Sequence, residues 1–103
     1  MGAEVRVLVY QAAYDETQLA AVRAAYHQVS GELADVPGML GNELLRDPLD
    51  PTALVVMSRW ASIEAFSAWE RGAAHRDTTE PLRPYRDART PSGFAVYEVD
   101  AAY

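Results

Sequence analysis

The chain has 103 residues, the size of one ordinary domain, and we interpret residues 1–103 as a single domain. Half of the residues are hydrophobic, but a chain this short buries only about 60–65% of its unfolded surface and would gain from a partner subunit. Nine arginines, no lysine and fifteen acidic residues give a net charge of −6, which disfavours general binding to nucleic acids or anionic membranes. The absence of cysteine excludes disulfides, thiol chemistry and cysteine-based zinc sites.

We expect no targeting or membrane-spanning segment. The longest purely apolar run, residues 53–57, is far shorter than the roughly 20 residues of a membrane-spanning helix. Glu4, Arg6 and Gln11 interrupt the apolar stretch near the N-terminus, which argues against a signal peptide. The sequence therefore predicts a cytoplasmic protein.

The first third of the chain predicts one strand followed by one helix. Residues 4–12 are rich in valine and contain no glycine or proline, which is typical of a β-strand. Asp15 is a candidate helix N-cap with Gln18 as its capping-box partner, and apolar residues then recur at helical spacing as far as Leu33. The Pro-Gly pair at 37–38 indicates the end of this helix.

The remaining elements are predicted from similar signals. In chain order they are a strand over 39–47, a hairpin loop, a strand over 53–60, a helix over 63–71 capped by Ser62, an irregular segment over 73–92 with a short helix near Thr79, and a strand over 93–100.

This order is strand, helix, strand, strand, helix, strand, which predicts an α+β, ferredoxin-like βαββαβ fold with a four-stranded antiparallel sheet. The first strand has apolar residues at both parities, with Leu8 and Tyr10 on one face and Val5, Val7 and Val9 on the other. The helices cover only one sheet face. We therefore predict a homodimer whose sheets pack face to face, as in a dimeric α/β barrel.

Three motifs carry a resemblance to a known family. Residues 37–41 read PGMLG at the start of the second strand, residues 58–62 read SRWAS at the end of the third, and residues 64–69 read EAFSAW in the following helix. In order and spacing they resemble the antibiotic biosynthesis monooxygenase family, over about residues 4–100. The resemblance implies small dimeric ferredoxin-like barrels. Some members oxygenate aromatic polyketides without metal or flavin, whereas others degrade haem, act on quinols or have no known activity.

Two catalytic patterns of this family are incomplete here. The haem-degrading members combine a tryptophan and a histidine, matched by Trp69 and His75, with an asparagine on the first strand, which this chain lacks. We therefore do not expect haem degradation. The members that oxidise polyketide anthrones use an asparagine four residues before the third-strand tryptophan and a tyrosine six residues after it. Those positions are Val56 and Phe66 here, so that only Trp60 matches.

Oxygenation without a cofactor needs a dry pocket for a flat aromatic molecule, a base and a group that stabilises an anion. His75 is the candidate base because the reference pKa of histidine lies near neutral, and Arg59, Arg83 or Arg86 is the candidate anion holder. Asn42 shares strand parity with leucines on either side, so it can face the interior, and a surface position is left open as the alternative.

We name as candidate catalytic residues His75, Trp60 and Trp69, and as candidate substrate-binding residues Tyr10, Asn42, Phe66, Arg59, Arg83 and Tyr85. Simpler interpretations are that Trp60 packs in the core, which is compatible with lining a pocket, and that His75 is solvated. The two histidines lie far apart in the sequence and no phosphate-binding loop is present, so we expect neither a metal nor another cofactor.

Positive charge gathers in residues 71–89. This segment holds five arginines and three acidic residues, a net charge of +2, whereas the rest of the chain holds four arginines and twelve acidic residues, a net charge of −8. Such a segment can attract an anionic substrate to a pocket, or simply form ion pairs in a solvated loop.

The sequence thus predicts a homodimeric, cofactor-independent monooxygenase that oxidises an aromatic polyketide or related phenol with dioxygen in antibiotic or secondary-metabolite biosynthesis. One alternative is a polyketide cyclase or dehydratase on the same fold, in which His75 or an arginine promotes an aldol step without oxygen. The other is a non-catalytic dimeric protein that binds a ligand.

Overall fold

The computed structural model describes residues 3–72, 78–90 and 93–103, and its elements follow the predicted order. They are β1 (Val5–Ala12), α1 (Glu16–Leu33), β2 (Met39–Arg46), β3 (Ala53–Trp60), α2 (Ile63–Glu70), the 3₁₀ helix η1 (Glu80–Tyr85) and β4 (Phe94–Glu98). The α+β, ferredoxin-like prediction is confirmed. The short helix expected near Thr79 corresponds to η1, which has a proline in its first turn.

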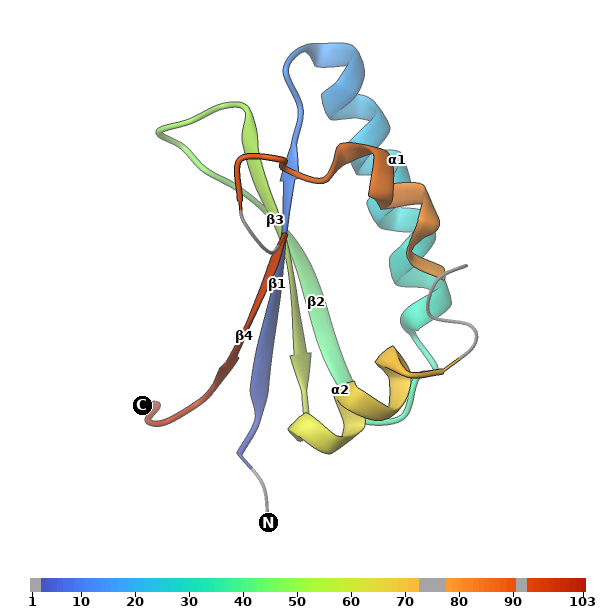
Figure 1. The fold of residues 1–103 in the computed structure, drawn as a ribbon, viewed down its shortest axis with the longest axis vertical. Helices are drawn as coiled ribbons and strands as arrows, with labels where there is room; N and C mark the ends of the chain where they lie inside the picture. The colour runs from blue at the N-terminus through green and yellow to red at the C-terminus, as the bar shows by residue number, and fades with distance from the viewer. Residues whose placement is uncertain (1–2, 73–77, 91–92) are drawn as a thin grey trace.

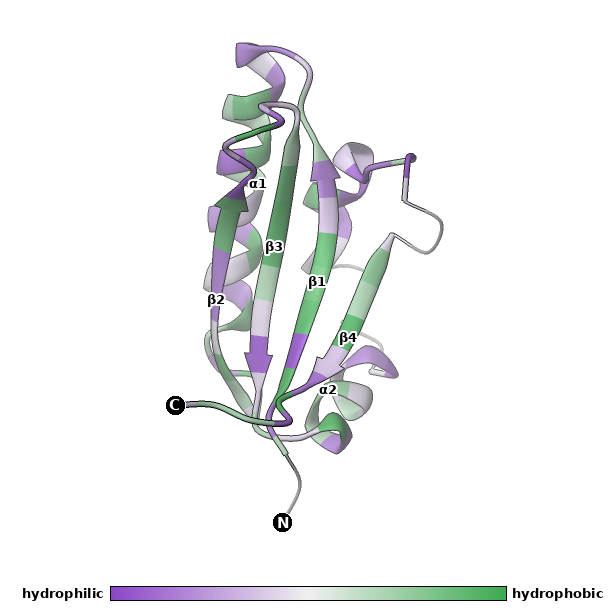
Figure 2. Ribbon diagram, turned by 90° about the vertical axis from the view of Figure 1, so that its left-hand side faces the viewer, coloured by the Kyte–Doolittle hydropathy of each residue, from purple (hydrophilic) through white to green (hydrophobic). Residues whose placement is uncertain are grey.

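The four strands form one antiparallel sheet in the order β2-β3-β1-β4. The helices α1, α2 and η1 all lie on one face of this sheet, and no described helix lies on the other (Figure 1). Figure 2 looks onto the uncovered face, where hydrophobic stretches of β3, β1 and β4 lie side by side. The sheet therefore has a helix-covered face, against which the three helices pack, and an uncovered face without a described helix.

The predicted capping box fixes the start of α1. The Asp15 side chain accepts a hydrogen bond from the backbone N–H of Gln18 (2.7 Å), and the Gln18 amide oxygen accepts one from the N–H of Tyr14 (2.8 Å). One apolar stripe of the helix then packs on the sheet. Its buried members are Leu19, Val22, Ala25, Val29 and Leu33.

Gly38 allows α2 to approach the start of β2. Its φ is +83°, and a Cβ at this position would lie 2.5 Å from Cβ of Ala65 on α2. The carbonyl of Gly38 also accepts a hydrogen bond from the N–H of Ala61 (2.8 Å), just before α2 begins. The proline-glycine motif thus holds α2 against the end of the sheet.

The core consists of two clusters on the helix-covered face. The larger one lies under α1 and η1 and includes Val22, Leu54 and Leu82. The smaller one lies under α2 and contains Val5, Val7, Trp60 and Phe66. The space between these two clusters forms the candidate site.

Neither α1 nor any other helix in the described part of the chain is both long enough and apolar enough to cross a membrane.

Candidate functional site

A cavity of about 290 Å³ lies between the helix-covered face of the sheet and the helices α1, α2 and η1. Its volume is near the lower end of the range for pockets that bind small molecules. Its apolar walls are formed by Val7, Val9, Val29, Leu33, Val56, Leu82 and Phe94. One end of the cavity is aromatic and is formed by Trp60, Phe66 and Trp69. The polar lining residues are Gln11, Asn42, Ser58, Glu70, Thr79, Arg83 and Arg86.

Three aromatic rings close the α2 end of the cavity. The ring of Trp60 packs edge-on against Phe66 (centroids 5.5 Å apart) and lies at 31° to the ring of Trp69 (5.4 Å apart). Ser62 caps α2 by accepting the N–H of Ala65 (3.1 Å), and Phe66 and Trp69 are three residues apart on one face of that helix. Both rings therefore reach the cavity from one face of α2.

Trp60 belongs to the buried core and also lines the cavity, because it ends β3 where α2 crosses the sheet. Its side chain is fully buried, and Nε1 donates a hydrogen bond to the Ser58 hydroxyl oxygen (2.9 Å). The polar edge of the indole is thereby satisfied within β3, and the ring forms part of the apolar wall of the cavity.

The sheet wall carries a polar pair beside this tryptophan. Asn42 on β2 and Ser58 on β3 are partners in the strand register. The Asn42 side-chain oxygen accepts a hydrogen bond from the Ser30 hydroxyl of α1 (2.8 Å), and the Tyr26 hydroxyl donates to the Asn42 carbonyl (3.3 Å). Asn42 is therefore held between the sheet and α1.

Gln11 fixes η1 against the other end of the cavity. The side chain is only 1% exposed, and its amide nitrogen donates to the carbonyls of Leu82 (3.0 Å) and Tyr85 (3.1 Å) in the orientation that satisfies both. Gln11 also forms an isolated antiparallel bridge with Arg86, whose N–H donates to the Arg83 carbonyl (3.2 Å). These contacts place two arginines beside the cavity.

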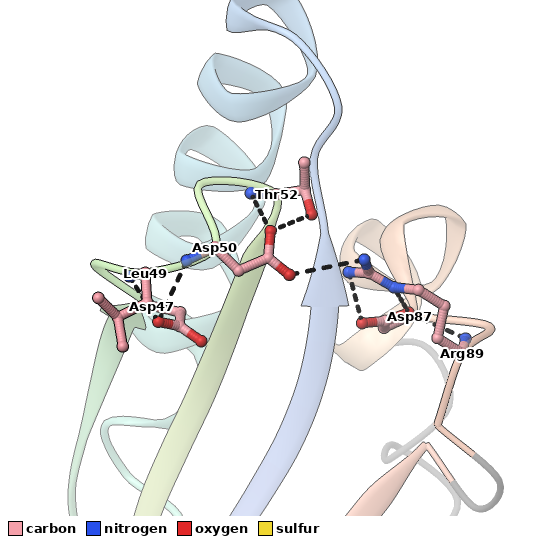
Figure 3. A network of polar contacts seen from close by, with 6 residues as sticks. All are labelled: Asp47, Leu49, Asp50, Thr52, Asp87 and Arg89. Carbon is pink, nitrogen blue, oxygen red and sulfur yellow. Dashed lines mark hydrogen bonds and ion pairs between the residues drawn. The ribbon is translucent and has the colours of Figure 1, made fainter.

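An ion-pair network holds the chain that follows Arg86 (Figure 3). The Asp87 carboxylate accepts hydrogen bonds from Nε (2.8 Å) and Nη2 (2.9 Å) of Arg89, and Nη1 of Arg89 lies 3.6 Å from the Asp50 carboxylate. Asp50 in turn accepts hydrogen bonds from the N–H (3.0 Å) and hydroxyl (2.6 Å) of Thr52. The turn between β2 and β3 is thus tied to the segment that carries Arg86.

The same contacts shift the pKa of each charged group in the network. Hydrogen bonds from Arg89 hold the pKa of the buried Asp87 carboxyl below its ordinary value, and the hydrogen bonds from Thr52 lower the pKa of Asp50. Asp87 in return raises the pKa of Arg89. All three groups are therefore charged at neutral pH.

The structure brings five of the nine candidate site residues together around the cavity, namely Trp60, Trp69, Phe66, Asn42 and Arg83. Their functional roles stay predictions. Trp60, Phe66 and Trp69 come from one short stretch of the sequence, whereas Asn42 and Arg83 come from distant parts of the chain and meet them only in the folded structure.

Three other candidates do not line the cavity. Tyr10 and Arg59 alternate along their strands with residues that do line it, so they point to the uncovered face, where a guanidinium nitrogen of Arg59 donates to the Leu40 carbonyl (3.5 Å). Tyr85 packs instead against the core under α1. His75, the candidate base, lies outside the described residues.

Four polar lining residues are not among the candidates predicted from the sequence, namely Gln11, Ser58, Glu70 and Thr79. Strand alternation contained a signal for two of them, since Ser58 shares parity with Trp60, and Gln11 with Val7. Within residues 3–72, 78–90 and 93–103, no group of three or more metal-ligating side chains is positioned to hold a metal ion.

An antiparallel sheet covered by helices on one face, with an aromatic-lined cavity beneath them, defines a ferredoxin-like protein with a pocket of small-molecule size. The family model described as antibiotic biosynthesis monooxygenase matches residues 6–81, and the chain belongs to this family.

Two curated relatives come from Streptomyces. Protein SchA of Streptomyces halstedii is 36% identical over 84 residues, which is 82% of this chain and 22% of SchA. The 42.8 kDa protein in the whiE locus of Streptomyces coelicolor is 33% identical over 81 residues, which is 79% of this chain and 20% of that protein. The chain thus spans about a fifth of the length of these relatives.

Solved structures share the fold at low sequence identity. SnoaB, described as a cofactor-independent oxygenase from Streptomyces nogalater, superposes with a TM-score of 0.77 at 15% identity, over 98% of this chain and 97% of SnoaB. A conserved protein from Methanosarcina mazei superposes with a TM-score of 0.74 at 12% identity, over 93% and 92% of the two chains.

Proposed function

We propose that this protein is a cofactor-independent monooxygenase for a small polycyclic phenol or anthrone of polyketide origin. The observation that carries the proposal is the cavity itself, which has an aromatic end, apolar walls and hydrogen-bond donors beside two arginines. Membership of the antibiotic biosynthesis monooxygenase family and the shared fold of SnoaB support it.

The proposed reaction removes a proton from the substrate and passes one electron from the resulting carbanion to dioxygen. When an anthrone becomes a quinone, one oxygen atom forms the new carbonyl, and the other leaves as water with the two hydrogens of the ring CH₂. The apolar walls exclude water, and Arg83 and Arg86 favour the substrate anion. His75 stays the predicted base.

Oxygen consumption tests this proposal. Purified protein is mixed with a panel of anthrones in an oxygen electrode, and the quinone product is followed by its absorbance and by incorporation of labelled oxygen from ¹⁸O₂. We expect uptake of one dioxygen for each quinone formed. Turnover under strict anoxia would instead favour the cyclase alternative, and binding without turnover in either atmosphere would favour a ligand-binding protein.

The proposal includes a homodimer formed through the uncovered sheet face. Leu8 and Tyr10 of β1 and Val55 and Met57 of β3 lie side by side on this face, all half-buried, and the exposed Leu45 of β2 extends the same apolar surface. The sheet of a second copy would bury these apolar side chains, which a single subunit leaves in contact with solvent. The cavity lies on the opposite face, so each subunit would keep its own pocket.

A further inference from the structure

Asn42 and Ser58 face each other across two neighbouring strands on the wall of the cavity. They are direct partners in the antiparallel β2–β3 register, and both line the cavity. Opposed residues in such a pair have their Cβ atoms about 4.5–5.5 Å apart on the same face of the sheet. Two short polar side chains at this separation can contact one and the same ligand atom.

The side-chain oxygen of each residue already accepts a hydrogen bond from another part of the protein. The Ser58 oxygen accepts the Trp60 indole N–H (2.9 Å), and the Asn42 side-chain oxygen accepts the Ser30 hydroxyl (2.8 Å). A hydroxyl then still has its O–H to donate, and an amide still has its NH₂ group. Among the residues that the structure describes, neither donor has a hydrogen-bond acceptor.

The surroundings of the Ser58 hydroxyl are mainly apolar. Ser58 lies between Val7 of β1 in the strand register and the buried ring of Trp60, and Val56 is the next residue on the same face of β3. A donor in such low-dielectric surroundings interacts strongly with negative charge. A ligand with an anionic oxygen at this place would satisfy both donors.

We propose that Asn42 and Ser58 form an oxyanion-binding pair that holds the ionised ring oxygen of the substrate. The proposal rests on the proposed function, and it narrows the substrate class to aromatic molecules with an ionisable hydroxyl or enol on the edge that faces β2 and β3. The aromatic ring of the substrate lies beside Trp60, and the Asn42–Ser58 pair lowers the pKa of the hydroxyl on that substrate ring. A substrate whose hydroxyl is methylated loses this interaction.

The experiment uses alizarin (1,2-dihydroxyanthraquinone), which changes colour when a ring hydroxyl ionises and is not consumed because it is already a quinone. Its absorbance is titrated against pH, free and bound to the protein. In the wild type we expect the first hydroxyl pKa of the bound dye to lie below that of the free dye. We expect Ser58→Ala and Asn42→Leu each to raise the bound value by about one pKa unit.

Two variants separate hydrogen bonding to the dye from an effect on folding. Ser58→Thr keeps the hydroxyl and should keep the wild-type value, and Ser67→Ala on α2 makes the same serine-to-alanine change away from the cavity lining and should do so too. Circular dichroism and tryptophan fluorescence check that each variant is folded and that Trp60 keeps its surroundings. If Ser58→Ala does not fold, Asn42→Leu alone tests the pair.

Equal pKa values for the dye bound to wild type, Ser58→Ala and Asn42→Leu would overturn the oxyanion-binding pair. Failure of the folded wild type to bind the dye would overturn it as well. The proposed oxygenase activity is judged separately by oxygen consumption. If the dye behaves as expected and no anthrone consumes oxygen, the pair stands as an anion site, and the monooxygenase assignment fails.

Discussion

The indole N–H of Trp60 donates to the hydroxyl of Ser58, two residues earlier on the same face of β3 (2.9 Å). The side-chain period of a β-strand makes such a contact possible, because residues two apart stand on the same face. This bond gives the largest fully buried side chain of the protein a fixed polar partner. Core packing and cavity lining are thus two properties of one well-anchored ring.

Ser58→Ala should lower the free energy of unfolding by about 1–3 kcal/mol, because it leaves the buried N–H of Trp60 without an acceptor. Urea denaturation followed by circular dichroism measures the change. Ser58→Thr restores the acceptor and should recover most of the loss. A Ser58→Ala variant as stable as the wild type would show that another group satisfies the indole.

Gln11→Leu should lower the free energy of unfolding by about 1–3 kcal/mol, since the carbonyls of Leu82 and Tyr85 lose their amide donor. The effect should be local as well as global. Hydrogen exchange measured by mass spectrometry should show faster exchange in peptides that cover residues 80–86 and little change in α1. Uniformly faster exchange over the whole chain would contradict a specific link between β1 and η1.

Asp87→Asn should make the protein less stable than the wild type at neutral pH. In acid the two proteins should be equally stable. The pKa of Asp87 is held below its ordinary value of 3.8 by hydrogen bonds from Arg89, so the charged carboxylate stabilises the fold above that pH. The stabilisation is lost as the pH falls below 3.8 through the lowered pKa of the folded state. Urea midpoints of both proteins from pH 7 to pH 2.5 should therefore converge at the acidic end. The exposed Asp100→Asn serves as the control.

Met57→Arg should convert the proposed dimer into a monomer, because the substitution places a charge in the apolar centre of the uncovered sheet face. Light scattering during gel filtration gives the mass directly. Thr17→Arg on the exposed side of α1 adds the same charge elsewhere and should stay dimeric. A wild-type protein that is monomeric at micromolar concentration would refute the dimer.

Arg86→Gln should weaken binding of ionised alizarin about three- to tenfold at low salt, because the cavity loses one of the two arginines that line it in the described part of the chain. The difference from wild type should shrink at about 1 M salt, where the Debye length falls to about 3 Å. Arg23→Gln on the exposed side of α1 is the matched control. A salt-independent loss would indicate that the side chain acts through packing.

Local signals predicted most of the fold. The capping box at Asp15, the proline-glycine motif at Gly38 and the alternation along the strands are all short-range features, and the structure contains each of them. The element bounds consequently agree within one or two residues. The 3₁₀ geometry of η1 was not predicted, and two of its carbonyls accept hydrogen bonds from Gln11, which is distant in the sequence.

The site was harder to predict, because both faces of β1 and β3 are apolar. Strand alternation places Tyr10 on one face of the sheet and Val9 and Gln11 on the other, but it does not show which of the two faces the helices cover. The phenol of Tyr10 suits an aromatic substrate, but the structure places this residue on the uncovered face. The charge of Arg59 suits a substrate anion in the same way, but this residue too lies on the uncovered face. The bulge between Met39 and Gly41 also interrupts the alternation before Asn42, which leaves Leu40 exposed.

Alternate residues of β3 lie on the helix-covered and the uncovered face of the sheet, where they meet different surroundings. Val56, Ser58 and Trp60 line the cavity, while Val55 and Met57 belong to the surface that a second copy would cover. A one-residue shift in pairing exchanges the two sets completely. Substitutions in β3 can therefore alter ligand binding or assembly separately, whereas a single inserted or deleted residue alters both at once. Natural variation in this strand should accordingly consist of replacements at constant length.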